Sequence, residues 1–321
     1  MQIIDFILHW GPVVTVISMA SLGAGFGGGI ATISALDAIT RSPRAHNSIA
    51  RALVLGLALI ETGAIIAMVT AVLLMRSSNT YDQQFQFDTI GRWGIALSLG
   101  ICALSVGIAS ASAVSEAFKS IARQPFFAHK LFNLMLITQS IIQTPVIFSF
   151  LIGLIIYSQL GSISNEVNAW RLLAAGLCIG IGSLGPICGL ARFAKAALRA
   201  LGSNREIYPK LLPFSFVSQA IIETPIIFAL VTSILIIFVP THNKAPIVGI
   251  ASSLAAALAI GIGTLMPGLS SGRTVAAACD SIAISPESST LLSRSSILVQ
   301  GIIDTSAVYA LLISVMCLIF G

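Results

Sequence analysis

The stretch Ile221-Ile222-Glu223-Thr224 has three counterparts in this chain: Leu59-Ile60-Glu61-Thr62, Ile141-Ile142-Gln143-Thr144 and Ile302-Ile303-Asp304-Thr305. The carboxylate or amide recurs at intervals of 82, 80 and 81 residues, always inside an apolar run. Ionisable groups at membrane depth are costly, rare and usually functional. Their return at one phase of a repeat predicts four copies of an ion-carrying unit joined end to end.

The composition is that of an integral membrane protein. Of 321 residues, 56% are hydrophobic and 9% are charged, and the mean hydropathy is +0.97. Eight runs are long enough to cross a bilayer as helices, and they are continuous rather than alternating in period two, which argues against strands. We therefore predict an all-α membrane protein whose eight transmembrane helices form four tandem hairpins in an arc. The predicted repeats are 1–80, 81–162, 163–242 and 243–321.

Lysine and arginine gather in the connections after the first, third, fifth and seventh helices, for example at Arg41, Arg123 and Arg205. The positive-inside rule places these connections in the cytoplasm and both termini on the outer side. We expect a protein of the bacterial inner membrane whose net charge of +5 reflects this topology and contact with anionic lipids, not nucleic acid. The five cysteines lack metal-ligand spacing. The sequence also has no phosphate-binding loop, Ser/His/Asp set or Cys/His cluster, so we predict no structural metal site, no cofactor and no catalytic residue.

The first helix of each repeat is rich in small residues. In the first repeat they are spaced by two, at Gly23, Gly25, Gly27 and Gly29. Residues two apart lie on both flanks of a helix, so such a helix can approach a neighbour closely on either side. The pattern favours an inner ring of helices over the alternative of a one-sided glycine-rich dimer face.

A short polar turn joins the two helices of each repeat. Its third residue is Pro43, Pro125, Arg205 or Pro286, and the carboxylate or amide follows 18 residues later in every repeat. At about 1.5 Å per residue, the group lies roughly 20–25 Å from the turn, inside the hydrocarbon. All four groups therefore share one depth, as equivalent ion sites require.

These residues resemble the c-subunit, or proteolipid, of rotary ATP synthases. The shared features are the small-residue first helix, the turn Arg123-Gln124-Pro125 and the second-helix carboxylate at fixed spacing, four times over almost the whole chain. The resemblance implies a non-catalytic, ion-translocating subunit that forms a rotor ring with copies of itself, beside the a-subunit of the stator and in contact with the central stalk of the catalytic head. The turn residues that would contact the head are Arg41, Pro43, Arg123, Gln124, Pro125, Asn204, Arg205 and Pro286.

The resemblance also implies a mechanism. Glu61, Glu223 and Asp304 would carry the ions: each carboxyl is neutral or ion-bound in lipid, because a bare carboxylate there is strongly disfavoured. Beside the stator it would ionise, release its ion to one side and reload from the other. The neighbours implied for these sites are Thr62, Thr224, Thr305, Gln219, Gln300 and Tyr309.

Gln143, followed by Thr144, departs from the family pattern. A glutamine cannot be protonated or carry charge, but its amide copies the shape of a protonated glutamate. It would therefore pass through lipid as a blank site. Two interpretations remain open, namely an adaptive reduction of ions per turn, towards pumping as in vacuolar-type rotors, and the tolerated loss of one site.

The carried ion is predicted to be the proton, with sodium as the alternative. The threonines after each site and Gln139, Gln219 and Gln300, four residues before, resemble a sodium site. However, the first-helix glutamine of a sodium cage is absent, since its position holds Gly28, Ser110, Leu190 and Ser271. The competing class is a secondary transporter or channel built of repeats, but such proteins typically carry midplane sites on broken helices. A purely structural ring would leave the three acids unexplained.

Overall fold

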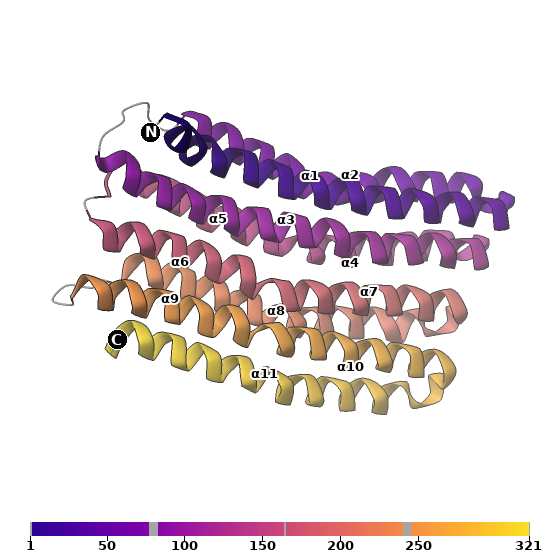
Figure 1. Ribbon diagram of the computed structural model, residues 1–321. Coiled ribbons are helices and arrows are strands. Elements are labelled where there is room, and N and C mark those ends of the chain that lie inside the picture. Colours follow the sequence, from indigo (N-terminus) through magenta and orange to yellow (C-terminus); the bar gives the residue numbers. More distant parts are fainter. Residues whose placement is uncertain (1, 77–82, 164, 240–244, 321) are drawn as a thin grey trace.

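The computed structural model shows four helical hairpins side by side (Figure 1), and it describes residues 2–76, 83–163, 165–239 and 245–320. Eight membrane-spanning helices run through these ranges, and the predicted all-α fold is confirmed. Both described chain ends lie at one end of the bundle, opposite the four turns (Figure 1). The boundaries predicted near residues 80 and 242 fall outside the described residues. The helices are α1 (Gln2–Arg41), α2 (His46–Arg76), α3 (Gln83–Arg123), α4 (Ala128–Ile142), α5 (Thr144–Gln159), α6 (Glu166–Gly182), α7 (Leu184–Ser203), α8 (Tyr208–Phe238), α9 (Pro246–Gly263), α10 (Leu265–Ile284) and α11 (Ser289–Phe320).

The four turns have one design. A single non-helical residue ends the first helix of each hairpin, and one turn of 3₁₀ helix then leads into the second. Three of these 3₁₀ turns begin with proline, whose fixed φ and missing amide hydrogen suit the first helical position. The 3₁₀ turns are Pro43–Ala45, Pro125–Phe127, Arg205–Ile207 and Pro286–Ser288.

Three of the eight spans are interrupted at one residue, which the continuous apolar runs did not predict. The breaks lie at Gln143, Ser183 and Thr264, between α4 and α5, α6 and α7, and α9 and α10. Each precedes a proline by two or three residues. Proline lacks the amide hydrogen and its ring presses on the carbonyl four residues earlier, so the helical hydrogen bonds fail there. The chain nevertheless keeps right-handed helical dihedrals at all three residues.

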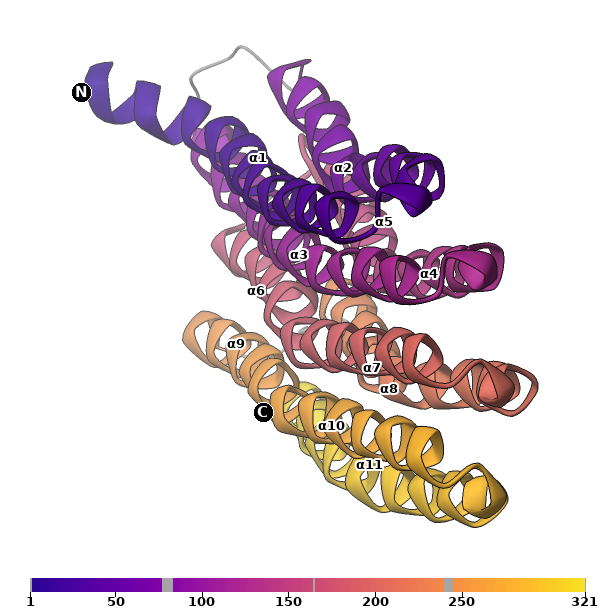
Figure 2. The ribbon, with the colours of Figure 1, turned by 90° about the vertical axis from the view of Figure 1, so that its right-hand side faces the viewer.

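The hairpins form two layers (Figure 2). The inner layer consists of α1, α3, α6–α7 and α9–α10, and the outer layer of α2, α4–α5, α8 and α11. Inner helices pack on each other much more closely than outer ones do. A methyl group on Gly27 would collide with the Gly107 carbonyl, and one on Gly189 with that of Gly268. Since one layer is tighter than the other, the sheet of hairpins must curve, with the inner layer on its concave side.

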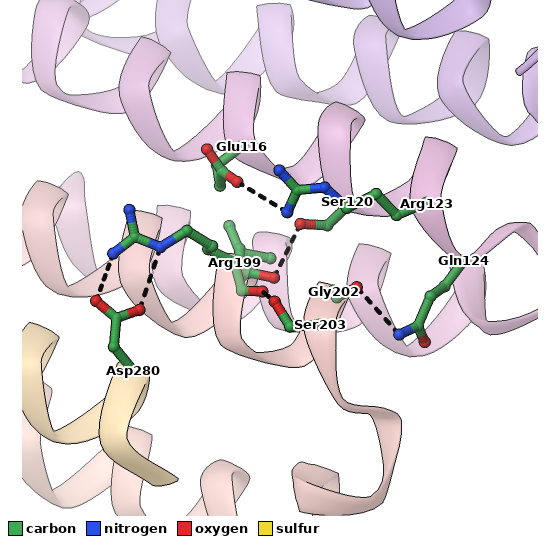
Figure 3. A network of polar contacts seen from close by, with 9 residues as sticks. Glu116, Ser120, Arg123, Gln124, Arg199, Gly202, Ser203 and Asp280 are labelled. Atoms are coloured by element: carbon green, nitrogen blue, oxygen red, sulfur yellow. Dashed lines mark hydrogen bonds and ion pairs between the residues drawn. The ribbon is translucent and has the colours of Figure 1, made fainter. Parts of the chain in front are cut away.

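Side-chain contacts fasten neighbouring hairpins at the turn end (Figure 3). The Ser120 hydroxyl donates to the Leu198 carbonyl at 2.9 Å, and Arg199 forms a bidentate ion pair with Asp280. At the opposite end, the guanidinium of Arg171 donates to the Ile236 carbonyl at 2.7 Å and so caps the last turn of α8. Both ends of the hairpins are therefore held by polar contacts, with apolar packing between.

Candidate ion-binding sites

The four predicted site residues all lie in the outer layer. Glu61 is on α2, Gln143 joins α4 to α5, Glu223 is on α8 and Asp304 is on α11. Each follows the third residue of its turn by 18 positions, through outer-layer spans of similar length. The fold thus repeats one geometry four times.

Burial of the site residues differs along the arc. Gln143 is 5% exposed and Asp304 8%, Glu223 is half-buried, and Glu61 is exposed. Gln143, Glu223 and Asp304 are covered because each packs beside the hairpin that precedes its own in the chain. The first hairpin has no such neighbour within one chain, and its carboxyl is left on the open edge.

Gln143 shows how a site residue reaches back to the preceding hairpin. Its side-chain amide donates to the main-chain carbonyl of Leu59 on α2 at 2.8 Å, and to the Ser110 hydroxyl on α3 at 3.3 Å. The acceptor Leu59 stands two residues before the site residue of the preceding repeat. A neutral donor group in the membrane is thereby held by a carbonyl of the neighbouring outer helix.

Glu223 also contacts the preceding hairpin, but through a side-chain hydrogen bond with Thr144 rather than a main-chain carbonyl. The Thr144 hydroxyl in turn donates to the Ile141 carbonyl at 2.8 Å. That carbonyl has lost its helical donor because residue 145 is proline. The other three threonines, Thr62, Thr224 and Thr305, also donate to carbonyls three or four residues earlier on their own helix.

The glutamines four residues before the sites are completely buried between the layers. Gln139 donates to the Ser110 carbonyl at 2.8 Å, Gln219 to the Ser215 carbonyl at 3.1 Å, and Gln300 accepts from the Ser271 hydroxyl at 3.4 Å. The remaining acceptors at these sites have no hydrogen-bond partner within the described residues. They are Oε1 of Gln139, Gln143 and Gln219 and Oδ1 of Asp304.

The polar surroundings are not equal in the four repeats. Ser110 and Ser271 present hydroxyls from the inner layer, whereas the matching position is Leu190 in the third repeat and Gly28 in the first. The first repeat also has Leu57 where the others have glutamine. At these two positions Glu61 has no side-chain oxygen, Glu223 has one and Asp304 has two.

Tyr309 lies at the outer surface, 68% exposed, and makes no hydrogen bond to Asp304 in the described part of the chain. The predicted head-contacting residues are at the turn end, and Arg41, Pro43, Arg123 and Arg205 are exposed, with Pro125 and Pro286 half-exposed.

Two of the turn residues also join hairpins. The Gln124 amide donates to the Gly202 carbonyl at 3.0 Å (Figure 3), and Asn204 donates to the Ala283 carbonyl at 3.3 Å.

Sequence reasoning missed the main-chain part of the site. The Leu59 carbonyl cannot be recognised from residue type, because every residue has one. Pro145 and Pro225, two residues after their site residues, give a signal only for the corresponding carbonyls of the second and third repeats, because the first repeat has Gly63 in that place. Each proline frees the carbonyl four positions earlier, at Ile141 and Ile221, which correspond to Leu59 in the repeat.

The family model for the C-subunit of ATP synthase matches this chain four times, at residues 13–74, 93–156, 173–236 and 254–317. The chain belongs to the ATP synthase C-subunit family. Each family match covers one hairpin and contains one site residue.

Relatives of two sizes agree with this membership. The K-subunit of the A-type ATP synthase of Methanocaldococcus jannaschii is 26% identical over 230 residues, which cover 72% of this chain and 96% of that protein. The second ATP synthase c-subunit of Cereibacter sphaeroides is 48% identical over 71 residues, 22% of this chain and 86% of its own length. The ATP synthase c-subunit of Dehalococcoides mccartyi is 40% identical over 74 residues, 23% of this chain and 97% of its own length. The family member described here is a rotor-ring subunit of a rotary ATP synthase built from four fused hairpins.

Proposed function

We propose that Glu61, Glu223 and Asp304 each carry one proton through the membrane, and that Gln143 is a site that never ionises. Rotation would couple proton flow to ATP synthesis or hydrolysis. The observation that carries the proposal is the hydrogen bond from the Gln143 amide to the Leu59 carbonyl. A protonated carboxyl has a donor where this amide has one, so Gln143 occupies the site as a loaded acid would.

The second repeat supplies an acceptor of this kind for Glu223. Protonated Glu223 can donate to the Thr144 oxygen, whose own hydrogen goes to the Ile141 carbonyl. The Ile221 carbonyl, freed by Pro225, is the corresponding acceptor for Asp304. A neutral, hydrogen-bonded carboxyl avoids the cost of a bare charge in lipid.

The proton is favoured over sodium by the weakest of the three sites. Sodium needs several oxygen ligands, and Gly28 and Leu57 supply none beside Glu61. A proton needs only the carboxyl and one acceptor. Because one gradient drives all sites of a ring, all three acids must carry the same ion, and Glu61 sets the requirement.

The partner that discharges the sites is a stator protein with water-filled half-channels and a basic side chain. There the carboxyl can ionise, release its proton to one side and reload from the other. An empty carboxylate cannot re-enter lipid, which makes rotation follow the gradient. Each elementary charge that crosses gains about 2.3 kcal/mol per 100 mV.

A carboxyl-directed carbodiimide tests the proposal on purified rings. We expect modification of Glu61, Glu223 and Asp304 that declines as pH rises and is unaffected by sodium, read by peptide mass spectrometry. Gln143 peptides serve as the internal control, because an amide does not react. Protection of the three acids by millimolar sodium at constant pH would overturn the proton assignment in favour of sodium.

We infer that a second copy of this chain completes the Glu61 site. Gly25 and Gly29 on α1 have nothing within 4 Å, while their repeat counterparts Gly268 and Gly272 pack against α7 without room for a side chain. The open flank of α1 thus carries the same approach surface. On the other edge, Thr305 occupies the place that Thr144 takes beside Glu223, and it is exposed.

A hydrogen bond between the third and fourth hairpins could be repeated at the junction between two chains. Within the chain, the Thr264 hydroxyl donates at 2.9 Å to the Gly182 carbonyl, which Pro186 has freed. Pro267 frees the Gly263 carbonyl in the same way on the last hairpin. The repeat counterpart of Thr264 is Ser21, which is exposed on α1. Head-to-tail addition of chains would pair Ser21 with that carbonyl and extend the arc into a ring.

The turn end is the surface for the central stalk. A cleft of about 580 Å³ opens between the second and third turns, and its lining includes Arg123, Arg205, Glu206 and the exposed ring of Phe126. The basic residues at this end support a cytoplasmic location for it by the positive-inside rule, and we propose that both termini lie on the outer side of a bacterial inner membrane.

A further inference from the structure

The inner face of α7 carries a narrow basic stripe. Of the residues between Gly185 and Gly202, only Cys188, Arg192, Lys195 and Arg199 are exposed. They are spaced by four, three and four positions, which places them on one side of the helix. Helices α3 and α10 cover the flanks of α7 and α8 lies behind it, so this stripe points away from the outer layer and its carboxyls.

Arg273 on α10 lies beside Arg192. Arg199 and Asp280 are in contact across the two helices, with atoms 3.1 Å apart. Arg192 and Arg273 each stand seven residues, or two helical turns, before a member of that pair. In that register Arg192 and Arg273 meet as Arg199 and Asp280 do, but both are cations. Neither makes a hydrogen bond or ion pair with another described residue, and both are exposed.

The acids of this region are already engaged. Asp280 holds Arg199, and the buried Glu116 lies 3.6 Å from Arg123 (Figure 3). Lys195, one turn from Arg192, adds a third cation to the pair. Arg192 is about 16 Å along the helix from the turn-end residue Ser203, within a membrane-spanning segment. Three neighbouring cations at this depth require an anion.

The surface beyond the cations is apolar. One turn further from the turn end, the inner face presents Phe26, Ile108 and Leu269 together with Cys188. A basic cluster next to an exposed apolar strip matches the head and the acyl chains of one molecule. Inorganic phosphate could neutralise the arginines but would leave this strip uncovered.

We propose that Arg192, Lys195 and Arg273 bind the phosphate of an anionic phospholipid that lines the concave face of the ring. The two guanidinium groups hold the phosphate oxygens from both sides, as paired arginines can. The acyl chains run along the apolar strip towards the ring interior. This site is independent of which ion the outer carboxyls carry.

The test uses rings purified in detergent with phosphatidylglycerol, whose retained lipids are counted by native mass spectrometry. Arg192→Glu places an acid beside Arg273 in the register of the Arg199–Asp280 pair, so the variant neutralises itself and should assemble. We expect its retained phosphatidylglycerol per ring to fall about fivefold. Arg51→Glu is the matched control, because Arg51 is exposed on the outer-layer helix α2, and it should retain the wild-type amount.

Two results would overturn the proposal. One is equal lipid retention by the Arg192→Glu and wild-type rings. The other is saturable binding of inorganic phosphate to delipidated rings that depends on Arg192 while phosphatidylglycerol does not compete, which would mark a free-anion site. Should Arg192→Glu fail to assemble, Arg192→Lys keeps the charge and loses the planar fork. It is expected to retain an intermediate amount of lipid, and full retention there would count against the paired-guanidinium site.

Discussion

At the scale of single residues, Gln143 has the contacts that we propose for a protonated acid at the same position, although its amide cannot ionise. The Gln143 amide donates to a carbonyl of the preceding hairpin, and the Ser110 hydroxyl lies on its other side. Glu223 and Asp304 occupy the same repeat position beside their preceding hairpins, and Glu61 would do so across the proposed ring junction. Under the proposed function, carrier and blank differ first in whether the side chain can ionise.

Replacing Gln143 by glutamate should restore a fourth carrier. The number of protons per chain and turn rises from three to four, so the ion-to-ATP ratio should rise by about one third. The ratio is measured from the proton-motive force at which synthesis and hydrolysis balance. Gln143→Met, similar in size and without a titratable group, should keep the original ratio. An unchanged ratio in an assembled Gln143→Glu ring would refute the blank-site interpretation.

The contact between neighbouring hairpins predicts an effect that crosses from one repeat to the next. Thr144→Val removes a hydroxyl whose hydrogen bond to Glu223 favours the ionised carboxyl, so the neutral form of Glu223 should become more populated and its carbodiimide labelling should be about fivefold faster at fixed pH. Thr224→Val is the control, because its hydroxyl donates to the Ala220 carbonyl of its own helix and its loss should leave the labelling of Glu223 unchanged. Equal labelling of Glu223 in the Thr144→Val and Thr224→Val rings would contradict this geometry.

At the scale of elements, hydropathy and spacing predict the eight spans and four turns. A long continuous apolar run crosses a bilayer as a helix, because its backbone polar groups must bond within the segment, and the polar turns lie outside the lipid. They do not predict the breaks at Gln143, Ser183 and Thr264. Those depend on prolines, and the freed Gly182 carbonyl accepts from Thr264 on the next hairpin, whereas the freed Ile141 carbonyl accepts from the nearby Thr144. The acids of the site were recognisable because charge in lipid is costly, whereas Leu59 contributes only its main chain and became visible only through the packing of hairpins.

The Thr264–Gly182 hydrogen bond should be worth more than an ordinary surface contact. Thr264→Val leaves the buried Gly182 carbonyl without a donor and should lower the free energy of unfolding by about 1–2 kcal/mol. In a Pro186→Ala background, residue 186 regains its amide hydrogen, and the same threonine change should cost less. Unfolding in mixed detergent micelles gives the free energy of unfolding of the wild type, the two single variants and the double variant, which together form a double-mutant cycle.

Thr274→Val is the control for that cycle, because its hydroxyl donates only to the Ser270 carbonyl of its own helix. Its cost should be the same in both backgrounds. Equal coupling for Thr264 and Thr274 would show that the proline does not create the need for the Thr264 donor.

At the scale of the whole molecule, the two edges of the arc are complementary. Gly25→Leu should leave the single chain folded, since nothing lies within 4 Å of Gly25, but should prevent ring closure. Gly301→Leu is the matched control, because Gly301 is equally open and its repeat counterparts Ser140 and Ala220 are exposed even between hairpins. Native mass spectrometry distinguishes rings from single chains, and rings formed by Gly25→Leu would place the junction elsewhere.

The intact ring should have a mass that is a whole multiple of 33.5 kDa. Because four hairpins are fused in each chain, the number of hairpins in the ring should be a multiple of four. A ring mass that requires a partial chain would show that the chain is cut after synthesis.

If the acids carry the protons as proposed, the fusion of one amide-bearing hairpin to three acid-bearing ones also fixes the order in which carriers reach the stator. Independent hairpins could arrange themselves in any order around a rotor, but here the blank returns after every third carrier. Three sites that can ionise beside the stator are then followed by one that cannot, and no proton transfer drives the rotation past that site. Torque delivered to the stalk should ripple once per chain, and single-molecule recordings under load should show pauses or double-length advances at that interval.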